Sequence, residues 1–264
     1  MLKPRGPGGR SLSRKLSSYS GRPLPLLIIL LGALVHGPLP LAADELTDAQ
    51  TLFNTGKYSE CIDAAAKGIE SRAWRESWWR LKIRAELETG RYADALATLE
   101  GAVKRFSSSL RLRLLGRDVY RFNNLPEKAE ERFVEAEEMV RRQRWRYSDP
   151  INRVLLGKFL LLRGADAKQV LETFFDRAKR AMPNHVETYL AIGQLGLDKH
   201  DYALAAEAFQ KAAELTPDDP AAHFGLATAC APSDPERTVL ALARALELNP
   251  HHADSLLMTA DRLI

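Results

Sequence analysis

The sequence predicts an all-α fold in which short helical hairpins repeat along the chain. In Val186–Asp219, apolar residues recur at helical spacing in two segments that flank a turn at residues 200–202. Stretches of the same form recur elsewhere, and their tyrosines Tyr58 and Tyr92 lie 34 residues apart. No alternating apolar run of strand type occurs beyond residue 44. Because one hairpin cannot bury its own apolar face, we expect the copies to stack.

The hairpin at residues 186–219 shows the pattern best. Asp201 stands where it can cap the second helix, and Thr216-Pro217 should end that helix. Small residues would let the two helix axes approach each other, and aromatic rings would fill the remaining space. The expected inward residues are Tyr189, Ile192, Gly193 and Gly196 on the first helix, and Ala205, Phe209 and Ala212 on the second.

These positions resemble the tetratricopeptide repeat, whose pattern runs W-x2-L-G-x2-Y, then A-x3-F, A and P in about 34 residues. Only Gly196 departs clearly, since an aromatic residue is usual there. The resemblance covers roughly residues 44 to 264 and implies a right-handed superhelical solenoid of about six helix-turn-helix hairpins plus a terminal single helix. The expected repeats are about 44–70, 71–107, 109–146, 149–184, 186–218 and 219–251, with a half repeat at 252–264.

Helix starts are signalled by three Asp-Pro pairs. Asp149-Pro150, Asp219-Pro220 and Asp234-Pro235 each place a capping side chain before a proline at the first helical position. The copy that begins at Pro150 follows the repeat pattern more loosely than the others.

The amino-terminal residues 1–43 have the order of a secretory signal. A basic segment precedes the charge-free run LPLLIILLGALV at residues 24–35, and helix breakers and small residues follow before Asp44. We expect cleavage after Ala43, with a retained membrane anchor at residues 24–43 as the alternative. Either outcome places the repeats outside the cytoplasm, in the periplasm or another extracytoplasmic space.

The calculated pI of 9.1 reflects mainly this segment. Six of the 38 basic residues precede Asp44, the first acidic residue, which leaves 32 basic and 34 acidic residues in the remainder. The basic balance is therefore no argument for nucleic-acid binding.

Catalytic and cofactor motifs are absent from the sequence. It contains no H-E-x-x-H, no G-x-S-x-G and no phosphate-binding glycine loop, so we expect no enzyme activity, no metal and no cofactor. Cys61 and Cys230 fall at small buried positions five repeats apart. Helices pack about 8–10 Å apart, and a disulfide requires Cα atoms within about 7 Å, so both thiols should be free and buried.

Three tryptophans cluster in the second repeat. Trp74 and Trp78 should share a helix face, and Trp79 matches the core aromatic of the repeat. A role in the core and as a wedge between repeats is favoured over a platform for stacking a ligand.

A row of basic residues lies on the expected first helices of the second to fourth repeats. In tetratricopeptide arrays these helices line a concave groove that holds peptides, which makes the row a candidate site for an acidic peptide. The alternative is a solvated face with compensating acids nearby. From Lys67 to Arg146 there are 19 basic and 13 acidic residues, against 12 and 16 from Tyr147 onward. The candidate residues are Arg80, Arg84, Arg113, Arg117, Arg121 and Lys158.

The function expected from the sequence is that of an exported, non-catalytic scaffold that binds a protein or peptide in its groove. The competing hypothesis is that the chain is the amino-terminal region of a larger envelope enzyme, of peptidase or glycosyltransferase type, whose catalytic domain lies beyond Ile264. Its support is the apolar single helix at residues 252–264, which lacks a partner.

Overall fold

A computed structural model describes residues 42–72 and 74–262 of the chain. Over these residues it contains helices and turns and no strand, and the expected all-α solenoid is confirmed. The signal or anchor predicted at residues 1–43 lies almost wholly outside the described residues. No helix within the described range is both long and apolar enough to cross a membrane.

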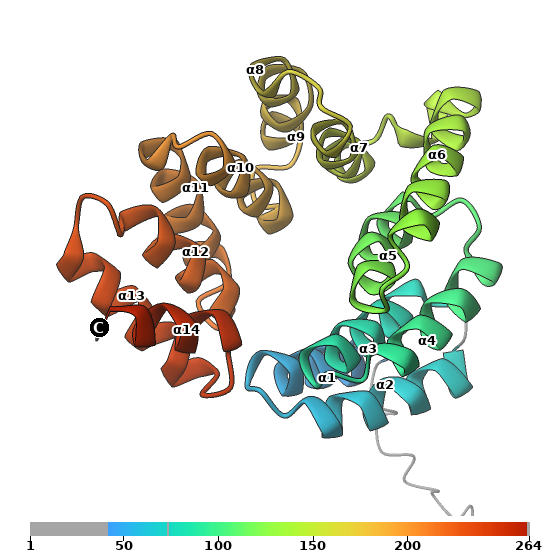
Figure 1. Cartoon of the computed structure of the whole chain (residues 1–264), viewed down its shortest axis with the longest axis horizontal. Helices are drawn as coiled ribbons and strands as arrows, with labels where there is room; N and C mark the ends of the chain where they lie inside the picture. Colours follow the sequence, from blue (N-terminus) through green and yellow to red (C-terminus); the bar gives the residue numbers. More distant parts are fainter. Residues whose placement is uncertain (1–41, 73, 263–264) are drawn as a thin grey trace, which may run out of the picture. The chain divides into compact units, whose positions relative to one another are not determined.

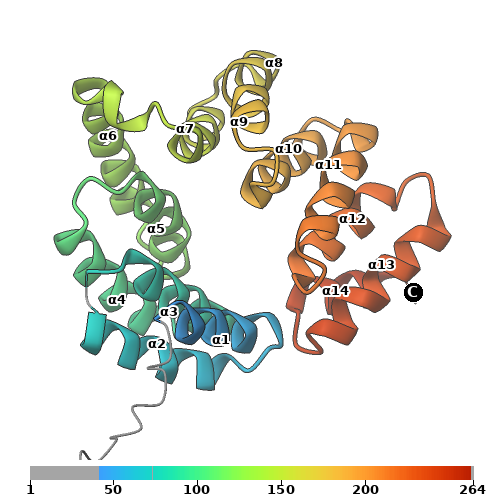
Figure 2. The ribbon, with the colours of Figure 1, turned by 180° about the vertical axis from the view of Figure 1, so that it is seen from behind.

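Successive helices pack as hairpins, and each hairpin packs beside the next (Figures 1 and 2). The first three pairs are α1 (Ala42–Asn54) with α2 (Tyr58–Arg72), α3 (Glu76–Glu88) with α4 (Tyr92–Arg105), and α5 (Leu110–Phe122) with α6 (Pro126–Arg142). The short η1 (Arg144–Tyr147) leads to α7 (Pro150–Leu162), which pairs with α8 (Ala167–Val170), η2 (Leu171–Phe175) and α9 (Asp176–Ala181). The remainder comprises α10 (Val186–Asp198), α11 (Tyr202–Leu215), α12 (Pro220–Cys230), α13 (Pro235–Leu248) and α14 (Ala253–Asp261).

Phe209 on α11 shows how neighbouring hairpins are held together. A Cβ atom built on Gly193 of α10 would lie 2.7 Å from the Phe209 ring, and one built on Gly225 of α12 would lie 2.3 Å from it. The ring is 4% exposed and fills the space that these two glycines leave open. Gly196 brings α10 close to the start of α11, because its added Cβ would lie 2.8 Å from the Ala205 backbone nitrogen. An aromatic side chain at position 196 would not fit, because α10 and the start of α11 approach each other closely there.

Each predicted Asp-Pro pair starts a helix. Asp149 accepts a hydrogen bond from the Asn152 backbone at 3.0 Å, and Asp234 accepts one from the Arg237 backbone at 3.0 Å. Asp219 accepts from the Ala221 backbone at 3.0 Å. These bonds satisfy backbone donors that would otherwise lack a partner at the helix start.

The looser fourth repeat has a physical cause in its second helix. The segment after α8 runs through a π-helical turn at Leu171–Phe175 before α9 begins. This turn places the fully buried Phe175 ring 2.5 Å from where a Gly157 Cβ would be. The widened turn keeps the aromatic-to-glycine contact although the spacing departs from the repeat.

The three tryptophans differ from their expected roles. Trp78, rather than Trp79, is the buried core aromatic, because it lies on the same face of α3 as Leu81 and Ala85. Its ring wedges against Gly68 of the preceding helix. Trp79 is half-buried, and Trp74 is 67% exposed and shares no buried face with Trp78.

The first and last hairpins touch through a buried hydrogen bond. Asn249, between α13 and α14, donates from Nδ2 to the Tyr58 hydroxyl at 2.9 Å and accepts from the His251 backbone at 2.9 Å. Gly56, with φ of 75°, passes so close to Asn249 that an added Cβ would lie 2.4 Å from its Oδ1. Residues 191 positions apart therefore share one buried polar contact.

We expect Gly225→Ala to destabilise the fold by about 1–3 kcal/mol, because the new methyl group must displace the Phe209 ring from a closely packed site. Urea denaturation followed by circular dichroism measures this loss. The surface variant Ala221→Ser on the same helix should stay within about 0.5 kcal/mol of the wild type. Equal stability of both variants would show that Phe209 does not hold α11 to α12.

Candidate functional site

Four basic side chains from three successive first helices form the candidate site. Arg80 and Arg84 lie one turn apart on α3, and α5 and α7 contribute one residue each. The positive charges of Arg84 and Arg111 lie close enough to lower the pKa of Arg80 and also that of Lys158. We call this group, Arg80, Arg84, Arg111 and Lys158, the basic wall.

The protein disfavours the positive charge of two residues of the basic wall, Arg80 and Lys158. Burial lowers the pKa of Arg80 to about 10, and the neighbouring cations Arg111 and Arg84 add to this decrease. Burial likewise lowers the pKa of Lys158, although its side chain remains accessible to solvent. Desolvation disfavours a charge of either sign, whereas neighbouring cations repel a cation and attract an anion, so it is these cations that would stabilise an anion placed here.

Acidic side chains lie near these cations, among them Glu88, whose carboxylate interacts with the charge of Arg84. Glu76 lies 3.6 Å from Arg80, and Glu187 of α10 forms an ion pair with Arg111. Asp118 lies 3.7 Å from Arg117. Burial raises the pKa of Asp118 in spite of the cations around it, so burial also disfavours the charge of this acid.

Arg80 and Arg84 line a pocket of about 280 Å³ between α1 and α3. The Arg84 guanidinium stacks on the Phe53 ring, with 4.3 Å from Cζ to the ring centroid, and this contact orients it. The Nε atom of Arg80 is buried and makes no hydrogen bond to the described residues, and the Glu76 carboxylate is the acid that lies 3.6 Å from it. The pocket is lined by Leu46, Thr47, Gln50, Ser77, Arg80, Leu81 and Arg84.

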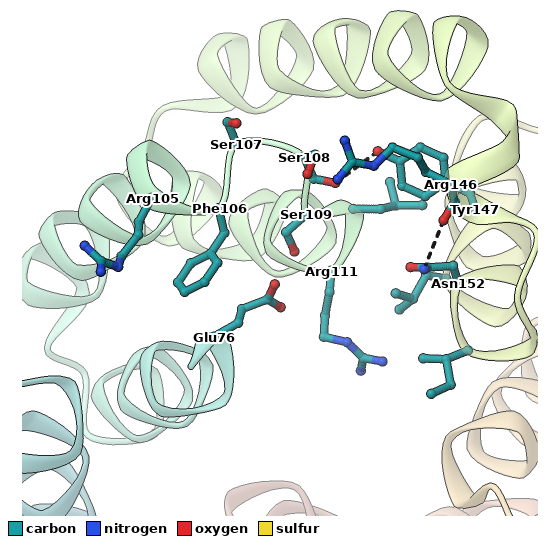
Figure 3. A pocket seen from close by; sticks show the side chains of 13 residues that line it. Glu76, Arg105, Phe106, Ser107, Ser108, Ser109, Arg111, Arg146, Tyr147 and Asn152 are labelled. Carbon is teal, nitrogen blue, oxygen red and sulfur yellow. Dashed lines mark hydrogen bonds between the residues drawn. The ribbon is translucent and has the colours of Figure 1, made fainter. Parts of the chain in front are cut away.

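A second pocket, of about 420 Å³, adjoins the wall at the start of α5. Glu76 of α3 and Arg111 of α5 both line this pocket, as Figure 3 shows. The far side is closed by Tyr147, whose hydroxyl donates to the Ser108 carbonyl at 3.0 Å, a bond drawn in Figure 3. Glu76 and Arg111 therefore border this pocket, and the ion pair with Glu187 holds Arg111 there.

The structure places the residues predicted from the sequence in three different environments. The basic wall contains three of them, Arg80, Arg84 and Lys158. The charge of Arg84 acts on both Arg80 and Lys158. Arg117 and Arg121 lie close enough to Asp118 to lower its pKa, and Lys158 does the same. These two arginines therefore border the wall at Asp118.

Arg113 is the exception and requires a correction. Its Nη2 donates to the Ser107 carbonyl at 2.9 Å, and the charges near it are those of Glu135 and Arg132 on α6. Two of its guanidinium nitrogens are buried without a hydrogen-bond partner among the described residues. Arg113 thus packs toward α6 and the turn before α5, away from the wall.

Local patterns in the sequence do not indicate Arg111 or its partner Glu187. Residues four apart on a helix are turned by about 40° from each other, so the series 113, 117 and 121 winds around α5. Arg111 and Asp118 are seven apart and share a face almost without drift. Arg111 thus shares a face with an acid and belongs to no row of basic residues at a spacing of four, and Glu187 belongs to another repeat and carries no local signal.

The histidine, cysteine and acidic side chains within residues 42–72 and 74–262 offer no cluster of metal-ligand type. Among the residues that the structure describes, no three His, Cys, Asp or Glu side chains come together as metal ligands would. The expected burial of Cys61 and Cys230 is confirmed, since they are 0% and 3% exposed. They belong to separate apolar clusters.

Two family models match parts of the chain. One, described as Bacterial transcriptional activator domain, matches residues 41–114. The other, described as Tetratricopeptide repeat, matches residues 190–231. No curated protein sequence matches the chain.

Solved structures of tetratricopeptide and related helical repeat proteins are similar in fold. A human IFIT1 dimer with m7Gppp-AAAA has a TM-score of 0.50 at 16% identity, and the match covers 76% of this chain and 48% of that one. YrrB, titled a TPR protein with an unusual peptide-binding site, has a TM-score of 0.40 at 18% identity, covering 75% and 99%. A thermophilic TPR protein from Thermus thermophilus has a TM-score of 0.41 at 15% identity, covering 84% and 98%. At these identities the similarity to IFIT1 concerns the fold alone, and the chain spans about half of its length.

We expect both thiols to resist modification in the native protein. Burial raises the pKa of Cys61 to about 11 and also raises that of Cys230, so at pH 8 little reactive thiolate is present. Titration with a chromogenic disulfide reagent should detect both thiols only after denaturant is added. Rapid labelling of either cysteine in the native state would contradict this expectation.

Proposed function

Because the chain is a tetratricopeptide repeat protein, we propose that it is a non-catalytic scaffold that binds an acidic segment of a partner protein at the basic wall. Helical repeat scaffolds of this family typically mediate protein–protein interactions. The observation that carries the proposal is the proximity of Arg80, Arg84 and Arg111, of which Arg80 and Arg84 line one open pocket and Arg111 lines the other.

The chemistry of the wall suits carboxylates. A guanidinium presents a planar fork of donors that binds a carboxylate through two parallel hydrogen bonds. Arg84 is already oriented by Phe53, which reduces the conformational entropy lost on binding. Hydroxyl and amide groups of Thr47, Gln50 and Ser77 line the same pocket and suit the backbone of an extended peptide.

A protein partner is favoured over nucleic acid by the charge balance. The chain from Asp44 onward has 32 basic and 34 acidic residues, and a nucleic-acid footprint requires an excess of basic residues. The positive charge is instead local, which suits a short acidic segment.

We expect a fluorescein-labelled hexa-aspartate peptide to bind the wild type and a hexa-asparagine peptide to bind at least tenfold more weakly. Fluorescence anisotropy measures both affinities. Arg80→Gln/Arg84→Gln should weaken hexa-aspartate binding by at least tenfold, since a hydrogen bond to a charged group contributes about 1.5–3 kcal/mol. Binding should also weaken as sodium chloride rises from about 0.05 to 0.5 M.

The matched control is Arg141→Gln/Arg142→Gln, which removes two arginines from an exposed face of α6. It changes the net charge equally and should leave hexa-aspartate binding within about twofold. An equal loss of affinity in both double variants would show that binding depends only on the overall charge of the protein. No loss at the wall would contradict the proposed site.

We further propose that the scaffold is exported, on the basis of the basic, apolar and small-residue order of residues 1–43. Amino-terminal sequencing of the protein isolated from its native cells should give Asp44 as the first residue. A start at Met1 in the membrane fraction would favour the anchor at residues 24–43. A start at Met1 in a soluble cytoplasmic fraction would contradict export.

A further inference from the structure

One ion pair of the basic wall joins helices that are not neighbours in the stack. Arg111 on α5 pairs with Glu187 on α10, 76 positions later, and the α7–α9 hairpin lies between them in the chain. Both side chains are less than a quarter exposed. In a solenoid most contacts join adjacent repeats, so a polar contact that passes over one repeat is unusual.

Glu187 also interacts with the rest of the wall. Arg111 is the strongest influence that keeps the pKa of Glu187 low, and Lys158 and Arg80 act in the same direction. Burial alone would raise that pKa, so the three cations together overcome it. The Glu187 carboxylate therefore lies where three cations of the wall act on a negative charge.

We infer that Glu187 is an internal competitor that occupies Arg111 in the free protein and is displaced by a carboxylate of the acidic partner. This inference rests on the proposed function, since the ligand is the same acidic segment. Displacement makes Arg111 available and adds it to Arg80 and Arg84 as a determinant of acidic specificity. By reciprocity, the bound ligand weakens the α5–α10 contact as much as that contact weakens the ligand.

Competition and a purely structural ion pair predict opposite effects of removing Glu187 on ligand affinity. If Glu187 only supports the fold, its removal leaves a half-buried cation unpaired and perturbs the site. If Glu187 competes, Glu187→Gln frees Arg111 and strengthens binding. Glutamine has nearly the same shape as glutamate, so the substitution changes mainly the charge.

The same hexa-aspartate peptide tests this by fluorescence anisotropy. We expect Glu187→Gln to bind about tenfold more tightly than the wild type, Glu187→Asp to stay within about threefold, and Arg111→Gln to bind more weakly. Circular dichroism and thermal unfolding establish that each variant is folded.

Asp118→Asn provides the matched control for charge. It removes one acid that acts on Lys158 but is paired with Arg117 and leaves the Arg111 pair intact. Its gain in affinity should be clearly smaller than that of Glu187→Gln. In an Arg111→Gln background, Glu187→Gln should then produce only this smaller gain.

The outcomes separate the inference from the proposed function. Wild-type binding with no gain in Glu187→Gln, or with an equal gain in Asp118→Asn, overturns the competition and leaves the proposed function standing. Absence of binding in both the wild type and Glu187→Gln overturns the proposed function as well. Binding that appears only in Glu187→Gln supports an internal competitor that masks the site completely.

Discussion

The packing of large rings against glycines on neighbouring helices governs the described part of the molecule. Phe209 fills the space left by Gly193 and Gly225, and Phe175 fills the space beside Gly157. Trp78 does the same at Gly68. Each contact excludes a Cβ atom on one side and buries an aromatic ring on the other, so the interface is close-packed and tolerates little change in volume. The helices are thereby fixed relative to one another with the precision that a binding surface needs.

This packing decides which side chains remain available for binding. On α3 the buried stripe contains Trp78, Leu81 and Ala85, and the basic residues Arg80 and Arg84 lie outside it. Because the first helices of neighbouring repeats pack side by side, a residue outside the stripe on one helix comes close to its counterparts on the next. The basic wall is therefore a product of repetition, although no single helix of it carries more than two of the four cations.

The wall combines attraction for anions with a built-in restraint. Its cations are partly desolvated and repel one another, and Glu187 offsets part of this repulsion from a different repeat. In the proposed competition, only a segment with enough negative charge displaces Glu187, so the site would discriminate against neutral peptides without a dedicated clash.

Local sequence patterns sufficed for the helix class, the hairpin repeat, the Asp-Pro starts and the burial of both cysteines, because each depends on spacing within one or two turns or on the repeat itself. They also located Arg80, Arg84 and Lys158 on the first helices. They assigned the core tryptophan to the wrong neighbour and included Arg113, because a one-residue difference rotates a side chain by about 100° and only packing decides which face is buried. The Arg111–Glu187 pair and the Asn249–Tyr58 bond join residues 76 and 191 positions apart. Such contacts depend on how the hairpins stack in three dimensions, and no local pattern encodes that distance, so only the tertiary structure decided them.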